Sequence, residues 1–411
     1  MLYFKNTDLA TTHHISLRTV LNWIEATKQG KLDLTLYTRG DKSYVANTSR
    51  NIALIEQLVN DRKKYRNKRS VKVVTPKKEF YELYDEQQVL DIVSNLDVYH
   101  EIPRQYNYFD QGAHYWDEYT HRLIQETSPN LLTQTVELLN LNQDYIDYLI
   151  DDYDRVNIVD VGAGNALPVK QFLEHMLSLG KLGRYIALDI SPEMLQIARQ
   201  NVQEWFGDKI SFEGYELDIT HDRFNRLLAD EYIEREDGKT INIVLIFGGT
   251  LGNLRSPDGA FKVIHDSMGR NDIMIFDDKL DTASSRRYFD FSAKPTSASL
   301  APNHRFIFDL FQIDESLYEV EMGYDPDATQ RYIRVRLKVA LVVSLKLNGG
   351  TRVVNFNKGD TIQLWRSWQQ ETPDITEQFE RNEFHTLLTS ETEDQEYLLA
   401  VTRIRSSNGS L

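Results

Sequence analysis

Between residues 157 and 278, short apolar segments alternate with amphipathic ones, and this alternation constrains the fold more than any other feature of the sequence. The segments NIVDVG, RYIALDI, ISFEGYELDI, INIVLIFGG and DIMIFDD predict buried strands. LPVKQFLEHMLSLG predicts a helix that ends at Gly180, and SPEMLQIARQNVQEWF predicts a helix with Ser191 as N-cap and Pro192 at its first position. Such alternation produces right-handed βαβ units, so we predict an α/β fold with a mainly parallel sheet.

The first strand runs into a glycine-rich turn, DVGAGNALP, whose ligand has to be inferred. A triphosphate-binding loop needs Lys and Ser or Thr after its last glycine, whereas Asn165 and Ala166 stand there. A dinucleotide fingerprint needs a third glycine, and Leu167 occupies that position. S-adenosylmethionine (SAM) has no pyrophosphate, so a turn that binds it does not need the third glycine. The turn favours SAM, and an NAD-dependent oxidoreductase stays open as an alternative.

Two acids follow the next two strands in phase with this turn. Gly162, Asp189 and Asp218 are 27 and 29 residues apart, which is about one βα unit per step. The carboxyl ends of parallel strands share one edge, where open α/β sheets bind ligands. Asp189 can accept hydrogen bonds from both ribose hydroxyls, and Asp218 can accept from the adenine amino group with Ile219 against the ring. Each acid alone is typical of a helix cap or a solvated loop, but together they favour SAM.

The N-terminal segment differs in charge from the rest of the chain. Residues 1–80 hold 16 Lys and Arg against 7 Asp and Glu, a net charge of +9, so the remainder carries −24 and the whole chain −15. Residues 1–75 are predicted to form amphipathic helices with a small hairpin at Gly40–Asp41, and this pattern resembles a helix-turn-helix module. A basic module can bind nucleic acid or dock a protein, and a structural role also stays open.

Composition excludes several kinds of site. The chain has no cysteine, which excludes disulfides, thiolate metal sites and cysteine nucleophiles. No histidine cluster suggests a metal site, and His13 and His14 are an isolated pair expected in a surface turn. No apolar run approaches the ~18 residues of a membrane span, and no signal peptide is visible. We therefore expect a cytoplasmic protein.

At FGGTLGNL (Phe247 to Leu254) the sequence resembles a specific family, the ergothioneine-pathway histidine Nα-methyltransferases. These SAM-dependent enzymes carry an F-L-G-S-T-I-G-N motif after the fourth strand and a Tyr-Asp-x-x-Gly segment that runs into a Phe-Asp-x-Ile-Thr helix. YFDQGAHYWDEYT, RRYFD and VEMGYD are similar to the motifs of the family, in the same order, over residues 95–411. The resemblance implies a Rossmann-like SAM-binding core with an additional α+β substrate domain, behind the small helical N-terminal domain.

The resulting domain prediction has five segments. They are a basic helical domain over 1–75, a linker with the first part of the substrate domain over 76–130, the Rossmann-like core over 131–283, the strand-rich second part of the substrate domain over 284–375, and a C-terminal return to the core sheet over 376–411. The resemblance also implies a set of cofactor-binding residues: Asp160, Gly162, Ala163, Gly164, Asp189, Ile190, Asp218, Ile219, Phe247 and Gly248. It implies that Tyr108, Asn253 and Tyr288 are catalytic and line the substrate.

Departures from the family bear on the substrate. Pro168 stands where the family has a lysine, and IQLWRSWQQ lacks the glutamate of the Glu-x-Ser pair that reads the imidazole. Arg366 in this strand suits an anionic group better than an imidazole, so we add it to the substrate-binding set. We predict N-methylation of an amino-acid-like small molecule other than histidine. The alternatives are a SAM-responsive, nucleic-acid-binding regulator and a methyltransferase for a macromolecule that residues 1–75 deliver.

Overall fold

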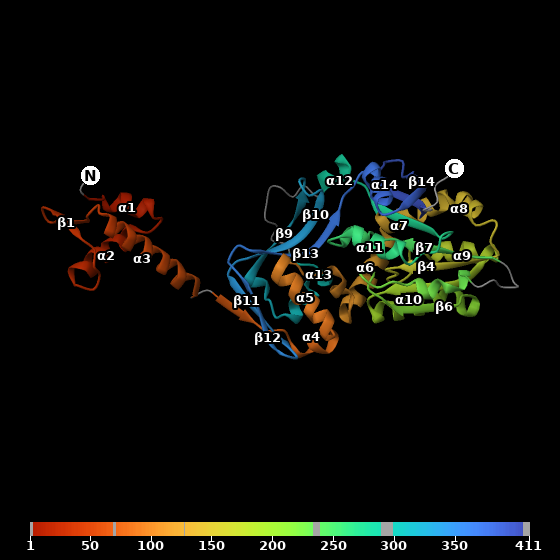
Figure 1. The fold of residues 1–411 in the computed structure, drawn as a ribbon, viewed down its shortest axis with the longest axis horizontal. Coiled ribbons are helices and arrows are strands. Elements are labelled where there is room, and N and C mark those ends of the chain that lie inside the picture. Colours follow the sequence, from red (N-terminus) through yellow and green to blue (C-terminus); the bar gives the residue numbers. More distant parts are fainter. Residues whose placement is uncertain (1–2, 69–70, 127, 233–238, 289–298, 406–411) are drawn as a thin grey trace. The chain divides into compact units, whose positions relative to one another are not determined.

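The structure is a computed structural model that describes residues 3–68, 71–126, 128–232, 239–288 and 299–405 (Figure 1). The chain forms two compact units, Met1–Lys72 and Val73–Leu411. Within the described ranges, no helix combines the length and the apolar character that a membrane crossing requires. The five domain boundaries predicted from the sequence stay predictions.

The first unit packs three helices and a hairpin around a small apolar core. Its elements are α1 (Asn6–Thr12), α2 (Leu17–Lys28), β1 (Leu36–Arg39), β2 (Lys42–Val45) and α3 (Ser49–Lys68). Ser16 caps α2 by accepting a hydrogen bond from the Thr19 backbone N–H. Gly40 adopts a φ of +60° in the turn that joins the antiparallel strands β1 and β2. Val20 of α2, Val45 of β2 and Ile55 of α3 are fully buried together.

A seven-stranded sheet of order β14-β15-β8-β7-β4-β5-β6 forms the base of the second unit (Figure 1). Its strands are β4 (Arg155–Val161), β5 (Leu182–Asp189), β6 (Phe212–Glu216), β7 (Thr240–Ile246), β8 (Ile273–Lys279), β14 (Phe384–Glu391) and β15 (Tyr397–Ile404). Strands β4 to β8 are parallel, and β15 pairs antiparallel with both β8 and β14. The predicted Rossmann-like α/β core is confirmed. The strand order reverses between β4 and β7, and ligands of such sheets bind beyond the strand ends at that point.

Helices cover both faces of this sheet. They are α7 (Leu131–Leu141), α8 (Gln143–Leu149), α9 (Lys170–Ser178), α10 (Pro192–Phe206), α11 (Pro257–His265) and α14 (Thr372–Arg381), with the short 3₁₀ turns η2 (Gly207–Lys209), η3 (Asn225–Tyr232) and η4 (Leu251–Asn253). In β4, Ile158 packs into the cluster on one face, whereas Val159 and Val161 pack into the cluster on the other. This two-sided burial explains why apolar residues of the strand face both sides of the sheet.

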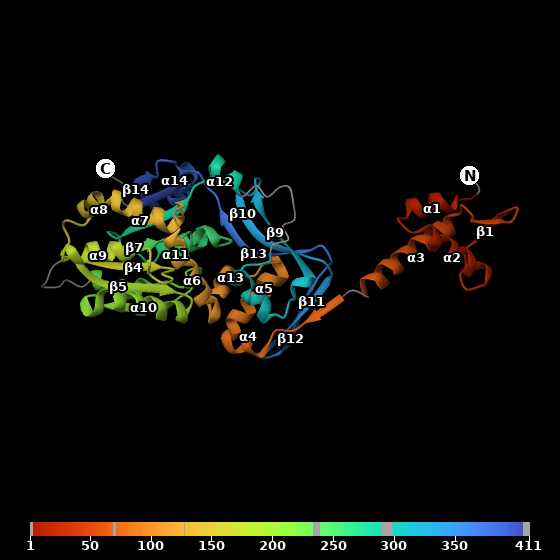
Figure 2. The same cartoon turned by 180° about the vertical axis from the view of Figure 1, so that it is seen from behind.

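The remaining elements of the second unit build a second layer of smaller sheets and helices. The strands are β3 (Val71–Val74, whose last two residues belong to this unit), β9 (Tyr318–Asp325), β10 (Gln330–Leu337), β11 (Ala340–Leu347), β12 (Gly350–Phe356) and β13 (Thr361–Trp368). The helices are α4 (Lys78–Leu83), α5 (Glu86–Tyr99), η1 (Arg104–Tyr108), α6 (Gln111–Gln125), α12 (Ala283–Tyr288), α13 (Pro302–Leu310) and η5 (Glu315–Leu317). The sheets have the orders β13-β10-β9 and β12-β11-β3. In both views, β9 to β13 lie at one end of this unit and β4 to β7 at the other (Figures 1 and 2).

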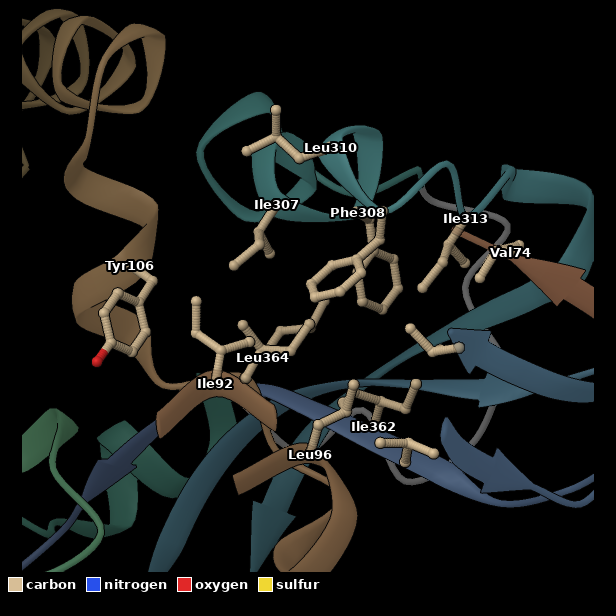
Figure 3. Close-up of a cluster of buried hydrophobic side chains, with 14 of the residues drawn as sticks. Val74, Ile92, Leu96, Tyr106, Ile307, Phe308, Leu310, Ile313, Ile362 and Leu364 are labelled. Atoms are coloured by element: carbon tan, nitrogen blue, oxygen red, sulfur yellow. The ribbon is translucent and has the colours of Figure 1, made fainter. Parts of the chain in front are cut away.

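One apolar core joins segments of this layer that are far apart in the sequence. Figure 3 shows Ile307 and Phe308 of α13 pointing toward Ile92 and Leu96 of α5 and toward Leu364 of β13. Ile307, Phe308 and Ile92 have no exposed surface. Leu96 and Leu364 are each 1% exposed. Residues 73–109 and 300–364 therefore share one core, although most strands of the seven-stranded sheet lie between them in the sequence.

Candidate active site

A cavity of about 650 Å³ lies at the carboxyl end of the parallel strands. Its volume falls within the range of about 300–1,000 Å³ that is usual for pockets holding a small ligand or cofactor. Residues that follow β4, β5, β6 and β7 line it from the sheet, and residues of η1, α6, β10 and β13 line it from the second layer. The cavity is therefore at the position where an α/β sheet of this order binds ligands.

The cavity brings together all of the predicted cofactor-binding residues and two of the predicted catalytic residues. They are Asp160, Gly162, Ala163, Gly164, Asp189, Ile190, Asp218, Ile219, Phe247, Gly248, Tyr108 and Asn253. Their shared position follows from the strand ends, because each cofactor-binding residue lies at or just beyond the end of β4, β5, β6 or β7. Their individual roles stay predictions.

The glycine turn after β4 favours residues without a side chain at two positions. Gly162 and Gly164 have φ angles of +71° and +54°, in the left-handed region that glycine populates freely. A Cβ atom on Gly162 would lie 3.0 Å from the Thr250 side chain. The Gly164 backbone N–H donates a 2.9 Å hydrogen bond to Asp189 Oδ2, so that the turn is tied to the end of β5.

The two predicted nucleoside-binding acids differ in their surroundings. Asp189 is 8% exposed, and its Oδ1 accepts a 3.0 Å hydrogen bond from the Ser191 backbone N–H. Burial raises the pKa of Asp189, and backbone N–H donors partly offset this rise. Asp218 uses Oδ1 to accept from the Thr220 backbone N–H and hydroxyl, at 2.9 and 2.7 Å. Because a carboxylate offers about four acceptor positions, both acids can still accept hydrogen bonds from a ligand.

Two further buried carboxyl groups support the turns of the cavity. Tyr185 donates a 2.7 Å hydrogen bond to Asp160 Oδ2, and burial raises the pKa of Asp160 to about 7. Asp277 Oδ2 accepts from the Gly248 backbone N–H at 3.3 Å and from the Thr135 hydroxyl. Burial also raises the pKa of Asp277 to about 7. Asp277 thus ties the loop after β7 to α7, and Asp160 joins β4 to β5.

Helix α6 forms the opposite wall and is fastened to the glycine turn. Asn165 Nδ2 donates to Asp117 Oδ1 at 2.8 Å and to the Thr120 hydroxyl at 2.5 Å. The rings of Tyr108 and Trp116 stack at 5.3 Å between centroids, and the Trp116 ring stacks on the tyrosine at position 119 at 5.0 Å. The segment that resembled the upstream family motif thus provides an aromatic wall of the cavity.

The two candidate catalytic side chains present polar groups to this space. The Tyr108 hydroxyl accepts a 3.1 Å hydrogen bond from Arg104 Nε. Burial raises the pKa of Tyr108, so its hydroxyl stays protonated at neutral pH. Asn253 ends η4, and its side-chain amide forms no hydrogen bond to any residue in the described ranges. Both groups are available to an acceptor molecule.

One predicted substrate residue, Arg366, is not among the described residues that line the cavity. Trp365 and Ser367 line the cavity, and Arg366 between them points to the other face of β13, because side chains alternate along a strand. There the Arg366 guanidinium forms a buried ion pair with Glu101. The expectation that Arg366 contacts substrate is not supported by this placement. Tyr288 is the last residue of α12, and its side chain lies outside the described part of the chain.

The cavity also contains residues that the sequence analysis missed. Asp278, at the end of β8, is 4% exposed, and burial raises its pKa to about 8, although the charge of Arg331 opposes this rise. The strand-end rule that selected Asp189 would have selected Asp278 as well. Arg104, His304 and Arg331 come from η1, α13 and β10, and no local motif marks them. In the described ranges, no group of three or more His, Asp or Glu residues is placed to hold a metal ion.

Comparison with known proteins adds a family match. The family model for histidine-specific, SAM-dependent methyltransferases matches residues 85–404. No curated protein matches the chain significantly.

Distant likenesses to solved structures are also found. A SAM-dependent methyltransferase from Clostridium acetobutylicum is 11% identical, with a TM-score of 0.40, over 71% of this chain and 99% of that one. The magnesium protoporphyrin IX methyltransferase of Synechocystis is 12% identical, with a TM-score of 0.37, over 74% and 98%. A glycopeptide N-methyltransferase crystallised with SAM is 10% identical, with a TM-score of 0.34, over 68% and 96%. Likenesses at this level carry no information about the substrate.

Proposed function

This chain belongs to the family of histidine-specific, SAM-dependent methyltransferases, and we propose that it transfers a methyl group from SAM to an amine of an amino-acid-like small molecule other than histidine. One observation carries the proposal. A single cavity has the glycine turn, Asp189 and Asp218 on one wall and Tyr108 and Asn253 among its polar lining groups. This arrangement suits a nucleoside cofactor and a small polar acceptor held side by side.

The residues of the sheet edge fit SAM. We assign the ribose hydroxyls to Asp189, the adenine amino group to Asp218, and the methionine part to the turn at Gly162 and Gly164. Each oxygen of the buried Asp189 carboxylate already accepts one hydrogen bond from a backbone N–H. These bonds fix the orientation in which the carboxylate would accept from the two ribose hydroxyls. Bound SAM supplies a methyl group activated by the sulfonium charge.

The chain's own contribution is to position an unprotonated amine and to exclude water. Tyr108 and Asn253 can each accept a hydrogen bond from an acceptor N–H, and this contact would orient the nitrogen lone pair. The cavity also contains the cations Arg104 and Arg331, both more than nine-tenths buried. Burial and nearby positive charge lower the pKa of an ammonium group, so they favour the neutral amine that attacks.

The identity of the cavity walls argues against histidine as the acceptor. Trp365, Met322 and Ile333 line the cavity beside Ser367. The glutamate with which the family reads imidazole is absent from this strand, so a neutral or apolar side chain fits better than an imidazole.

The test is methyl transfer by the full chain with isotopically labelled SAM and a panel of free L-amino acids, read by mass spectrometry. We expect label on the nitrogen of at least one amino acid other than histidine. Transfer only to histidine, to oxygen or carbon, or to no member of the panel would contradict the proposal.

For the first unit we propose nucleic-acid binding as a second function. Residues 1–72 carry 14 Lys and Arg against 6 Asp and Glu, a net charge of +8. The exposed side of α2 borders β2, where Lys28, Lys42 and Asn22 share one surface depression. A helix next to a strand hairpin is a common arrangement for a groove of DNA, and the charge supplies phosphate affinity.

Fluorescence anisotropy of the full chain with a labelled DNA duplex tests this second function. We expect affinity to fall steeply with salt, and the double substitution of Lys28→Ala and Lys42→Ala to reduce the logarithmic salt slope by about 2. No binding, or binding that ignores salt, would exclude nucleic acid and leave protein docking as the interpretation.

A further inference from the structure

One buried cation in the cavity has no counter-charge among the described residues. Arg104 is 6% exposed and lines the cavity. Within the described ranges, no carboxylate oxygen lies within 4 Å of its guanidinium. Its hydrogen bonds go to neutral groups, from Nε to the Tyr108 hydroxyl at 3.1 Å and from Nη1 to His304 Nδ1 at 2.5 Å.

The other cationic side chains of the cavity wall either have an acidic neighbour or are exposed to solvent. Arg331 has acidic neighbours, among them Asp281 and the glutamate at position 396, whose charges offset part of the cost of its burial. Lys279 Nζ lies 3.6 Å from a carboxylate oxygen of the glutamate at position 396. The arginine at position 122 is exposed on α6 and stays in contact with solvent. Among the described cations of this wall, Arg104 alone is both buried and without an acidic neighbour.

The surroundings of Arg104 hold its guanidinium in a fixed plane. Its Cζ atom lies 4.8 Å from the centroid of the Trp116 ring and 5.5 Å from that of Tyr108. A guanidinium has five N–H donors, and two of its three nitrogens take part in the two hydrogen bonds above. The Nη2 group has no partner in the described ranges and is not among the fully covered atoms that lack one. It is therefore free to donate to a molecule in the cavity.

His304 adds a second donor to this corner. Burial, together with the charge of Arg104, holds the pKa of His304 well below its usual value, so the ring is neutral. Because Nδ1 accepts the hydrogen bond from Arg104, the ring proton resides on Nε2. His304 also lines the cavity. The corner thus offers two kinds of donor, a guanidinium and an imidazole N–H.

We propose that Arg104, with His304 beside it, binds a carboxylate group of the methyl acceptor. Burying a guanidinium without an anion is unfavourable, and a carboxylate is the group whose geometry matches its paired donors. The assignment to the acceptor rests on the proposed function, in which Tyr108 contacts the acceptor, because Arg104 donates to that same hydroxyl. The substrate class is then an amine that carries a free carboxylate, and carboxamides or esters of the same amine are poor substrates.

The first experiment measures binding and needs no turnover. The full chain, saturated with S-adenosylhomocysteine (SAH), is titrated with L-amino acids and with the carboxamide of each. We expect the acids to bind and their carboxamides to bind about 10- to 100-fold more weakly, as for the loss of a charge-assisted hydrogen bond. Arg104→Gln should weaken the acids by a similar factor and leave the carboxamides unchanged, with Arg104→Lys intermediate.

The matched control is Arg305→Gln, which removes the same charge from the neighbouring position on α13. Arg305 pairs with Asp309 and Glu315 at the surface and does not line the cavity, so acid binding should stay unchanged. If Arg104→Gln fails to fold, the comparison of acid with carboxamide on the unaltered chain still decides the question. Equal binding of acids and carboxamides, or no binding of any acid, would overturn the proposal.

A second experiment separates the acceptor from the cofactor, which also carries a carboxylate. SAH and its decarboxylated analogue are titrated into the unaltered chain and the Arg104→Gln variant. The proposal requires the variant to bind SAH within about twofold of the unaltered chain, because loss of a charge-assisted hydrogen bond would weaken binding tenfold or more. A tenfold loss for SAH without a loss for the analogue would assign Arg104 to the cofactor and overturn the proposal.

The two proposals can fail separately. Acids that bind through Arg104 but receive no label from SAM would contradict the proposed methyl transfer and leave the carboxylate site standing. Amino acids and carboxamides that are methylated equally well would leave the proposed function standing and overturn the carboxylate site.

Discussion

Asp189→Asn is the substitution that most directly tests the assignment of the cofactor site. Each carboxylate oxygen of Asp189 accepts one backbone hydrogen bond, from Gly164 at 2.9 Å and from Ser191 at 3.0 Å. An asparagine keeps one acceptor oxygen and replaces the other with an NH₂ group, which only donates. One backbone N–H therefore loses its partner, and one of the two acceptor positions proposed for the ribose hydroxyls becomes an NH₂ group, to which a hydroxyl cannot donate.

The expected magnitude follows from the hydrogen bonds that this substitution removes. A buried donor left without a partner costs about 1–3 kcal/mol, so the SAM-free variant should lose roughly that much unfolding free energy. Hydrogen bonds to a charged group contribute about 1.5–3 kcal/mol each. The variant loses one ribose hydrogen bond and the negative charge that strengthens the other, so the binding free energy should weaken by about 3 kcal/mol, which corresponds to a Kd for SAH about 10²-fold higher.

Isothermal titration calorimetry with SAH, together with denaturant unfolding of the SAM-free protein, measures both free energies. Asp218→Asn is the comparison, because Asp218 lies in a more exposed turn and is assigned a single hydrogen bond to adenine. Its Kd should rise by about tenfold or less. A Kd for Asp189→Asn within threefold of the unaltered chain, or a larger effect at Asp218, would refute the assignment.

Three further predictions concern turnover, pH and packing. Asn253→Ala should lower kcat at least tenfold without changing the Kd for SAH by more than about twofold, since one hydrogen bond to the acceptor is removed; unchanged kcat would remove Asn253 from the site. Burial raises the pKa of Asp278 to about 8, so the folded chain keeps a proton that the unfolded chain releases near pH 4. This group therefore makes the free energy of unfolding fall as pH rises from about 5 to 8, by up to about 1.4 kcal/mol per pH unit. Asp278→Asn should flatten that slope in denaturant titrations at several pH values. The control is Asp258→Asn, which should lower stability evenly over the same range, because Arg381 donates to Asp258 and keeps its pKa low despite partial burial. Equal slopes for the unaltered chain and Asp278→Asn would contradict the assignment. Gly112→Ala would place a Cβ atom 2.1 Å from a backbone oxygen of η1, so the variant should lose methyl transfer or fail to fold, and a fully active variant would show that η1 can shift.

The sheet core was predicted correctly, and the residues assigned to the cofactor do lie together at one edge of it, because both depend on local patterns. Two-sided burial makes β4 rich in apolar residues on both faces, and the turn at Gly162 adopts a positive φ, so both leave a signature in consecutive residues. The acids after β5 and β6 follow from strand spacing alone. The family assignment and SAM as the cofactor, predicted from FGGTLGNL and its companions, are confirmed by the match to residues 85–404.

The acceptor side could not be predicted in the same way, because its residues meet only through long-range packing. Arg366 was chosen for its chemistry, but the alternation of β13 and the position of Glu101, 265 residues earlier, direct its side chain away from the cavity. Arg104 and His304 are 200 residues apart and lie in different elements. Which arginine lacks an acidic neighbour is a property of the folded chain, and no local pattern encodes it.

The order in which the chain visits the seven-stranded sheet limits how the protein can be shortened. Strand β15 pairs along the whole of β8, yet Lys279 and Tyr397 are 118 residues apart. A truncated fragment that stopped after β8 would keep the glycine turn and both nucleoside-binding acids but would expose the backbone of a strand that is otherwise interior. Because an open, apolar strand edge recruits other chains, such a fragment would be expected to aggregate before it could be tested for cofactor binding.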